Sequence, residues 1–223
     1  MNSFDLVIFD LDGTVADTLT DVHLSLNLAL EQLNLPQISV ETSKKAIGPG
    51  PQEFIKHVLP SDSMHRSDEF HRVFRPIYLS HCIRHAQLFE GIRQLVDQLK
   101  NENILCALAT NKARLGTQPL ADKFSFDSLF NLVVTRDEVE KPKPSPDMLI
   151  KAADLLSIPT SRALMIGDTD NDLYAAQSAG MKFCLARWGY SDKMDELAAS
   201  SDFVAAHPLE IMNFIKMDVY ADV

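Results

Sequence analysis

Three aspartates of this chain lie where their carboxylates could hold a cation. Asp10 and Asp12 follow a short apolar run, Leu6 to Phe9, and Asp168 follows another, Ala163 to Ile166. If extended geometry persists beyond the first run, the carboxylates of Asp10 and Asp12 start on the same side of the chain. Converging carboxylates repel one another, and a hard cation such as Mg²⁺ relieves that repulsion. A capping role would explain one such aspartate, but three of them at the ends of apolar runs favour a magnesium site.

A third apolar run also leads into polar side chains. The run from Ile104 to Ala109 is followed directly by Thr110 and Asn111. Ligands of open parallel sheets bind beyond the carboxyl ends of the strands, so we expect the three polar segments to converge on one site. The chain has no glycine-rich nucleotide loop and no Gly-x-Ser-x-Gly segment, so neither nucleotide cradling nor serine hydrolysis is indicated.

The elements that position these residues are those of an α/β fold. Short apolar runs of the kind found in buried parallel strands alternate with helical patterns in the later part of the chain. That alternation predicts a parallel sheet flanked by helices. The predicted strands are Leu6 to Phe9, Ile104 to Ala109, Leu132 to Val134, Ala163 to Ile166 and, more weakly, Phe183 to Ala186.

One region breaks the alternation and reads as entirely helical. It extends from about Val15 to Gln87, directly after the first predicted strand, and we call it the insert. We therefore predict a core domain of residues 1–14 and 88–223 and a helical domain of residues 15–87. Gly48-Pro-Gly50-Pro lies between two predicted helices of the insert, and it is either a plain loop or a substrate loop above Asp10.

Composition restricts the class of partner. The 223 residues carry a net charge of -10, which argues against nucleic acid because phosphate backbones demand clustered Lys and Arg. No apolar run approaches the ~20 residues of a membrane span. The N-terminus carries no export signal, and the three scattered cysteines fit a reduced compartment. We expect a cytoplasmic monomer or homodimer that acts on a small molecule.

Four motifs, taken in order, resemble those of the haloacid dehalogenase superfamily. They are Asp10-Leu-Asp12-Gly13-Thr14, Thr110-Asn111, Lys141-Pro-Lys143-Pro144 and Gly167-Asp168-Thr-Asp-Asn-Asp172. Within the superfamily, the likeness is greatest to phosphoglycolate phosphatases, through segments such as Thr110-Asn-Lys112 and Trp188-Gly-Tyr190. The resemblance implies a Rossmann-like parallel sheet core with a small helical cap domain inserted after the first strand. It also implies a Mg²⁺-dependent phosphatase that hydrolyses a small phosphorylated metabolite through an aspartyl phosphate.

The resemblance further implies a role for each aspartate. Asp10 would be the nucleophile that attacks phosphorus. Asp12 would be the general acid and then the general base, and its main-chain carbonyl would bind Mg²⁺. Asp168 and the Asp10 carboxylate would complete the protein's share of the metal ligands, and Asp172 would orient a ligand or a metal-bound water.

Roles for the remaining motifs follow in the same way. Thr110 would hydrogen-bond the phosphoryl group, helped by the backbone near Asn111. Lys141 would neutralise charge on the phosphoryl group and on Asp10, because the family's lysine precedes Pro-x-Pro. Lys143 would then be a solvated surface charge. In the substrate-loop interpretation, Gly48 and Gly50 would contact the substrate.

Two alternatives have the same nucleophile. A β-phosphoglucomutase-like mutase would usually have Val in place of Thr14 and a histidine twelve residues after the nucleophile, where this chain has Val22 with His23 next to it. A signalling receiver also uses an acidic Mg²⁺ cluster, but the insert and Asp12 argue against it. The lifetime of phosphorylated Asp10 separates an enzyme from a switch.

Overall fold

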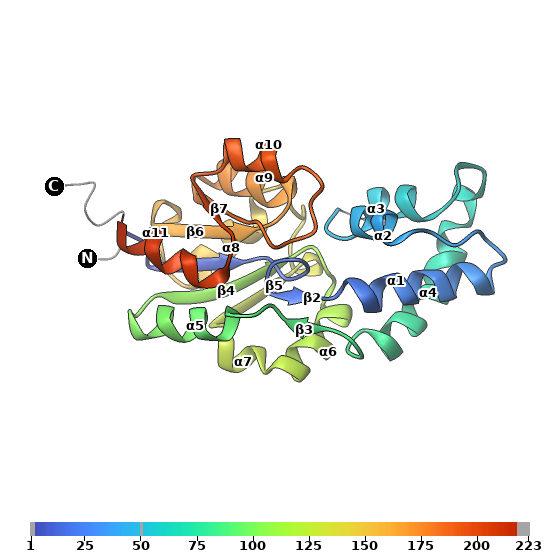
Figure 1. Ribbon diagram of the computed structural model, residues 1–223, viewed down its shortest axis with the longest axis horizontal. Helices are drawn as coiled ribbons and strands as arrows, with labels where there is room; N and C mark the ends of the chain where they lie inside the picture. The colour runs from blue at the N-terminus through green and yellow to red at the C-terminus, as the bar shows by residue number, and fades with distance from the viewer. Residues whose placement is uncertain (1–2, 50, 218–223) are drawn as a thin grey trace.

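The computed structural model describes residues 3–49 and 51–217. Figure 1 shows a layered part, in which helices flank a sheet, and a separate group of helices beside it. No helix among the residues described is long and apolar enough to cross a membrane.

The layered part is built on a six-stranded sheet in which every pairing is parallel and the order is β5-β4-β1-β6-β7-β8. Five strands coincide with predicted apolar runs, which confirms the predicted Rossmann-like α/β fold. The short strand β8 was not predicted, because three residues are too few to give a recognisable apolar run. The strands are β1 (Leu6–Phe9), β4 (Leu105–Thr110), β5 (Leu132–Thr135), β6 (Ala163–Gly167), β7 (Lys182–Ala186) and β8 (Phe203–Ala205).

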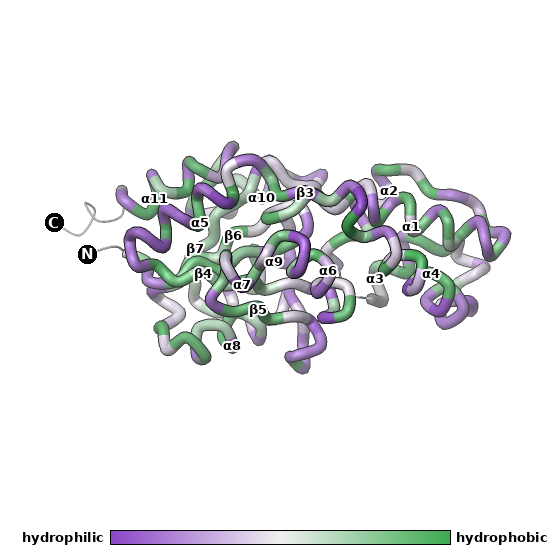
Figure 2. The backbone as a smooth tube through the Cα atoms, turned by 90° about the horizontal axis from the view of Figure 1, so that it is seen from below, coloured by the Kyte–Doolittle hydropathy of each residue, from purple (hydrophilic) through white to green (hydrophobic). Residues whose placement is uncertain are grey.

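Helices cover both faces of this sheet. Successive side chains of the central strand β1 point to opposite faces, so that Val7 and Phe9 join one apolar cluster and Leu6 and Ile8 join the other. Figure 2 shows apolar stretches along the strands and mixed stretches along the helices around them. The helices are α5 (Ile92–Asn101), α6 (Arg114–Phe124), α7 (Phe126–Leu129), α8 (Asp147–Leu155), α9 (Asp170–Ala179), α10 (Met194–Ser200) and α11 (Ile211–Met217), with 3₁₀ turns η2 (Arg136–Glu138), η3 (Thr160–Arg162) and η4 (Pro208–Glu210).

The insert is helical and has an apolar core of its own. Leu26 and Leu30 of one helix pack in a cluster with Phe70 and Tyr78 of another. The helices are α1 (Leu19–Gln32), α2 (Val40–Ala46), α3 (Pro51–Val58) and α4 (Ser67–His81), with the 3₁₀ turn η1 (Ser61–Arg66). Of these, α2 was not predicted, because its sequence VETSKKA has no apolar face to recognise.

The chain leaves and re-enters the layered part at adjacent points. The strands β2 (Ala16–Asp17) and β3 (Gln87–Leu88) pair antiparallel, so the two connections of the insert lie side by side. The buried carboxylate of Asp21 accepts hydrogen bonds from the backbone N–H groups of His85 and Ala86 at 2.9–3.0 Å. This junction is therefore held by backbone pairing and by one aspartate that sequence reasoning did not single out.

Candidate active site

The turn after β1 places two aspartates at the carboxyl edge of the sheet. The Leu11 carbonyl accepts hydrogen bonds from the N–H groups of Thr14, Val15 and Ala16, so the chain turns back tightly after Asp10. Gly13 adopts a φ of +88°, and a Cβ there would lie 2.5 Å from Asp168 Oδ2. Glycine is therefore required for conformation and for space.

Of the three aspartates expected to converge, Asp10 and Asp168 lie together, whereas the third carboxylate of the cluster is Asp172 and not Asp12. Asp10, Asp168 and Asp172 are buried, and one oxygen from each lies within 4.8 Å of the others. Asp168 is held in place by Thr14 Oγ1, which donates to it at 2.9 Å, and by the backbone N–H of Tyr190 at 2.7 Å. Residues from the ends of β1 and β6 thus meet although they are far apart in the sequence.

The lysine of the site is Lys143, and the expectation that Lys141 fills this position is wrong. Lys143 Nζ lies 2.6 Å from Asp10 and 2.6 Å from Asp172, and its side chain is 2% exposed. Lys141 is exposed to solvent. Asn111 Nδ2 donates to the Lys143 carbonyl at 2.9 Å, which fixes the backbone of this lysine beside the end of β4. A tertiary contact therefore determines which lysine of the Lys-Pro-Lys-Pro segment faces inward.

The charges of this cluster do not balance. Burial raises the pKa of Asp10 to about 7, because it outweighs the lowering effect of Lys143, and Asp172 adds to the rise. Burial, followed by the charge of Asp10, also holds the pKa of Asp168 well above its usual value. Three buried carboxylates share one ammonium group, an excess of negative charge that a hard divalent cation would offset.

Asp12 lies apart from this cluster. Its carboxylate accepts a hydrogen bond from Thr18 Oγ1 at 2.5 Å and pairs with Lys112 Nζ at 2.9 Å. Lys112 Nζ also lies over the ring of Tyr78 of α4, 5.2 Å from its centroid. Burial by itself lowers the pKa of Lys112, but the effects of Asp12 and Tyr78 outweigh burial. The pKa of Lys112 is therefore raised above its ordinary value. Lys112 belongs to a segment that carried the family resemblance, yet sequence reasoning gave it no role.

Asn111 joins the insert to the sheet. Its Nδ2 donates to the Gly48 carbonyl at 2.8 Å, in addition to the bond with Lys143. The amide hydrogens of Asn111 are therefore bound to backbone oxygens. Gly48 lies within reach of the site, whereas Gly50 lies outside the described residues.

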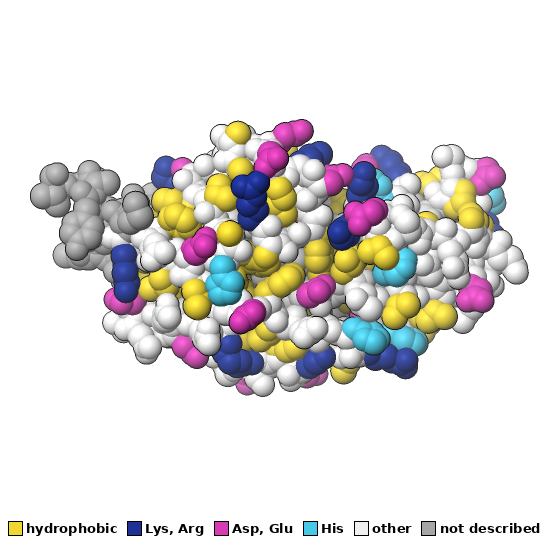
Figure 3. Space-filling view, viewed as in Figure 1, with side chains coloured by type: hydrophobic (Ala, Val, Ile, Leu, Met, Phe, Trp, Pro, Cys, Tyr) yellow, Lys and Arg dark blue, Asp and Glu magenta, His cyan; other side chains and the backbone are white. Residues whose placement is uncertain are grey.

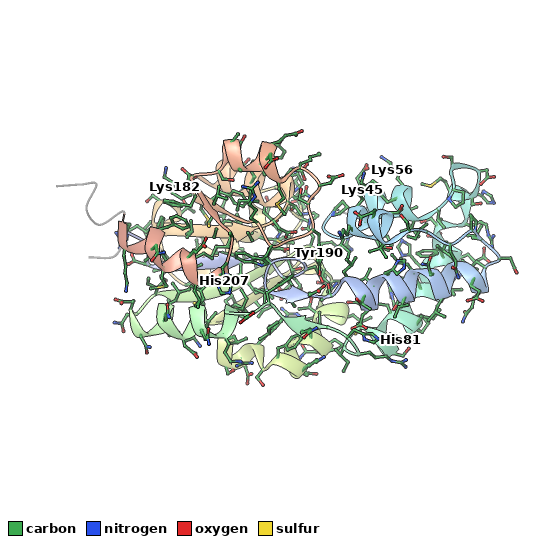
Figure 4. The ribbon with its side chains drawn as sticks, in the orientation of Figure 1. Lys45, Lys56, His81, Lys182, Tyr190 and His207 are labelled. Carbon is green, nitrogen blue, oxygen red and sulfur yellow. The ribbon has the colours of Figure 1, made fainter. Side chains whose placement is uncertain are left out.

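The loop after β7 closes the site from the other side. Figure 4 shows Tyr190 at the junction of the two parts. Its hydroxyl donates to Asp17 at 2.7 Å and accepts from the N–H of Thr18 at 2.8 Å, while Trp188 Nε1 donates to the Thr14 carbonyl at 3.0 Å. Tyr190 thereby connects Asp168 with the junction of the insert. In the sequence, the segment Trp188-Gly-Tyr190 stands out only through the family resemblance.

A cavity of about 470 Å³ opens between the sheet and the insert. Asp10, Asp12 and Thr110 line it on the side of the sheet, and Phe74 and Tyr78 of α4 line it on the other. Thr110 Oγ1 accepts a hydrogen bond from the Lys112 N–H at 3.1 Å and donates to no other group in the described part of the chain, so its own hydrogen can reach a ligand. The arrangement places two carboxylates, those of Asp10 and Asp12, and the hydroxyl of Thr110 around one space.

Comparisons with known proteins agree with this geometry. Residues 7–186 match the family described as haloacid dehalogenase-like hydrolase. A phosphoglycolate phosphatase of Aquifex aeolicus is 30% identical over 210 residues, which cover 94% of this chain and 96% of the relative. An N-acetylmuramic acid 6-phosphate phosphatase of Pseudomonas putida is 28% identical over 94% of this chain and 95% of its own length. The chain belongs to the haloacid dehalogenase-like hydrolase family.

The solved structures lead to the same class. The crystal structure of a predicted phosphoglycolate phosphatase from Haemophilus somnus has a TM-score of 0.85 and 28% sequence identity, and the match covers 96% of this chain and 99% of that one. The predicted class of enzyme, a phosphatase of the haloacid dehalogenase type, is confirmed by these relatives.

Proposed function

We propose that this chain is a Mg²⁺-dependent phosphatase that transfers the phosphoryl group of a small phosphomonoester first to Asp10 and then to water. The observation that carries the proposal is the pair of buried contacts that Lys143 makes with Asp10 and with Asp172, next to Asp168, where Asp10 itself lines the cavity. A carboxylate placed in that position can attack phosphorus only if positive charge offsets its repulsion by the phosphate.

The charge of Lys143 serves both the nucleophile and the substrate. Its ammonium group contacts Asp10 at 2.6 Å and neutralises charge on the phosphoryl group as the group approaches. Thr110 donates its free hydrogen to a phosphoryl oxygen. Asp10 then carries the phosphoryl group as an acyl phosphate, and water releases it.

Asp12 acts as the general acid and then as the general base. It protonates the leaving oxygen in the first step, and it accepts a proton from the attacking water in the second. Thr18 and Lys112 hold its two oxygens, which fixes the direction in which the carboxyl group faces. Its distance from the acidic cluster suits this role, because a carboxylate bound to a metal could not hold a proton.

The donor set fits magnesium. Asp10, Asp168 and the main-chain carbonyl of Asp12 would hold the ion, and hard oxygen donors are what Mg²⁺ prefers. Asp172 contacts Lys143 through one oxygen and Thr169 through the other, and its proposed part is to support Lys143 and to orient a metal-bound water. When bound, the ion supplies positive charge that offsets repulsion between the carboxylates and the phosphate dianion.

The insert is proposed to act as a cap domain that covers the leaving group. Gly48 would contact the substrate, since it lines the cavity together with Asp10. Closure would exclude water and strengthen every charge interaction inside. By analogy with the phosphatase relatives, the substrate is a small phosphorylated metabolite of the phosphoglycolate kind. We place the activity in the cytoplasm, in a monomer or homodimer that binds neither nucleic acid nor membrane.

The contacts of the insert weigh against the mutase alternative. Val22 lines the cavity at the position where such mutases have a histidine. His23 does not replace it, because its Nδ1 lies 2.9 Å from Ser43 Oγ in α2.

Phosphate release from a panel of phosphomonoesters tests the proposal, with Mg²⁺ present and then removed by a chelator. We expect turnover only with the metal, and a short-lived phosphoryl adduct on Asp10 after rapid acid quenching. Lys143→Ala should lose most activity, whereas the matched variant Lys141→Ala should retain it. A long-lived phosphorylated Asp10 without turnover would indicate a receiver, and full activity of Lys143→Ala would contradict the mechanism.

A further inference from the structure

The helix α1, which leads from the layered part into the insert, does not use the cap that its sequence offers. Thr18 occupies the N-cap position, where a threonine side chain commonly accepts a hydrogen bond from the first turn. Thr18 forms no such bond, and its Oγ1 donates instead to the carboxylate of Asp12. The side chain best placed to cap α1 is therefore engaged by the proposed general acid.

A tyrosine from a distant loop accepts hydrogen bonds from the start of α1. The Tyr190 hydroxyl accepts from the backbone N–H of Thr18 at 2.8 Å and from that of Leu19 at 3.2 Å. It donates to Asp17 at 2.7 Å, and the Asp17 carboxylate shares the Leu19 N–H, also at 3.2 Å. Because the first N–H groups of a helix have no partner within the helix, Tyr190 caps α1 from 172 residues away.

Contacts on several sides hold Tyr190 in this place. A Cβ on Gly13 would lie 2.9 Å from Tyr190 Cδ2, so the ring packs closely on the turn after β1. On another side, the ring centroid lies 6.5 Å from that of Phe89, in the connection that returns from the insert. The backbone N–H of Tyr190 donates to Asp168 at 2.7 Å. The position of the hydroxyl is therefore set by the layered part and not by α1.

The surroundings of this hydroxyl favour lasting hydrogen bonds. Figure 4 shows Tyr190 at the junction of the two parts, and in Figure 3 hydrophobic side chains reach the surface where the layered part meets the helices. Burial, followed by the hydrogen bond with Asp17, raises the pKa of Tyr190. The hydroxyl thus keeps its proton and continues to donate to Asp17, and hydrogen bonds in a partly apolar setting are stronger than in water.

A continuous chain of hydrogen bonds leads from this hydroxyl to the general acid. Tyr190 binds the N–H of Thr18, and Thr18 Oγ1 binds Oδ1 of Asp12, while Lys112 binds Oδ2. Without the Tyr190 hydroxyl, the Thr18 N–H loses its acceptor. The Thr18 side chain is then free to take the capping role that threonine prefers, and Asp12 loses the contact that fixes its direction on the side of α1.

We propose that Tyr190 is a positioning residue for the general acid: it caps α1 from the layered part and thereby keeps the Thr18 hydroxyl on Asp12. The inference rests on the proposed role of Asp12 in the phosphatase, and it assigns the control of that carboxyl group to the loop after β7. Tyr190 does not line the cavity that Asp10 and Asp12 line. Its effect must therefore appear in the step that takes a proton from Asp12.

The choice of leaving group separates a loss of proton donation from a general loss of activity. An alkyl phosphate needs a proton on its departing oxygen, whereas p-nitrophenolate departs without one. In Tyr190→Phe, which keeps the ring, kcat/KM for an alkyl phosphate should fall roughly 10- to 100-fold, a part of the loss expected when a general acid is missing. For p-nitrophenyl phosphate it should stay within about twofold of wild type, because no general acid is needed. Equal losses on the two esters would overturn the proposal.

Thr18→Val shows whether the effect passes through Thr18. This substitution keeps the β-branched shape and removes the hydroxyl that binds Asp12, so it should reproduce the selective loss on the alkyl ester. Adding Tyr190→Phe to Thr18→Val should cause little further loss, because residues that act through one another are not additive. Losses that multiply in the double variant would refute the route through Thr18.

Two controls exclude other causes. Tyr174→Phe is the matched control, because the Tyr174 side chain lies on α9 and is 53% exposed, and it should keep the wild-type rates on both esters. The Mg²⁺ concentration for half-maximal rate should not change in Tyr190→Phe, because the bond to Asp168 comes from the Tyr190 backbone. An increased Mg²⁺ requirement would locate the defect at Asp168 and contradict the proposal. Thermal unfolding checks that all variants fold.

Hydrogen exchange tests the cap itself without any substrate. Amides in the first turn of α1 should exchange faster in Tyr190→Phe than in wild type or in Tyr174→Phe, whereas those of α5 should not change. Equal exchange at the start of α1 would refute the capping. Wild-type protein that releases phosphate from neither ester would instead contradict the phosphatase, and with it the catalytic part of this inference, while faster exchange in Tyr190→Phe would still support the cap on α1.

Discussion

Replacing Lys143 should destabilise the protein strongly, in a way that depends on pH. The change to test is Lys143→Met, which keeps much of the side-chain volume and removes the charge, with Lys141→Met as its matched control. Lys143 is 2% exposed and contacts Asp10 and Asp172 at 2.6 Å. Removing one partner of a buried ion pair typically costs about 3–5 kcal/mol, because the remaining charge is left uncompensated. The total free energy of unfolding of a domain of this kind is roughly 5–15 kcal/mol.

The sign of the pH dependence follows from Asp10. Its pKa in the folded protein is raised to about 7 by burial, although Lys143 opposes the rise, and loss of Lys143 raises the pKa further. A carboxyl group with a raised folded pKa contributes stability that is complete at low pH and is lost as pH rises through that pKa. The loss of stability in Lys143→Met relative to wild type should therefore be large near pH 8 and should shrink toward pH 4.

Urea unfolding of the metal-free protein across this pH range measures the effect. Lys141→Met should stay within about 0.5 kcal/mol of wild type, as expected for an exposed side chain. Mg²⁺ should restore part of the stability of Lys143→Met near pH 8, since it supplies the missing positive charge. Equal losses in the two variants, or a deficit that grows as pH falls, would refute the reasoning.

Further outcomes are expected at the same site. Asp10→Asn should release no phosphate, because an amide is a poor nucleophile, and an active Asp10→Asn would remove Asp10 from the mechanism. Without metal, wild-type stability should fall as pH rises through about 7, because burial raises the pKa values of Asp10 and Asp168. The gain in Tm on adding Mg²⁺ should therefore be larger near pH 8 than near pH 5. A larger gain near pH 5 would contradict this expectation. Lys112→Met should lower kcat roughly 10- to 100-fold, because it releases the carboxyl group of Asp12 and so impairs acid–base catalysis. It should also change the pH profile of kcat. An unchanged pH profile would mean that Lys112 has only a structural role.

The architecture could be predicted because its signals are local. A sheet covered on both faces requires apolar side chains at every position, so strands such as Leu6–Phe9 stand out as continuous apolar runs. Since ligands bind at the carboxyl ends of parallel strands, Asp10 and Asp168 could be placed at one site before any contact was known. Helical periodicity likewise identified α1, α3 and α4 of the insert.

Short elements gave no such signal. Strands β2, β3 and β8 have two or three residues each, fewer than a periodic pattern needs, and they are held by pairing with distant segments. The short helix α2 is stabilised by its packing against α1 and α3 and by the Ser39 cap, and not by an apolar stripe of its own.

By itself, the sequence determined the order of the chemical groups along the chain, and the tertiary structure decided which of them meet. Lys141 and Lys143 lie two positions apart in a proline-rich loop with no periodicity, so nothing local distinguishes the inward lysine from the outward one. Lys143 is held inward by contacts with distant segments, the bond of Asn111 to its backbone and its ion pairs with Asp10 and Asp172. The same holds for the contact of Lys112 with Asp12, since that distance depends on the pairing of β4 with β1. Strand order and loop packing, set by burial of the whole sheet, bring together charges that are a hundred or more residues apart.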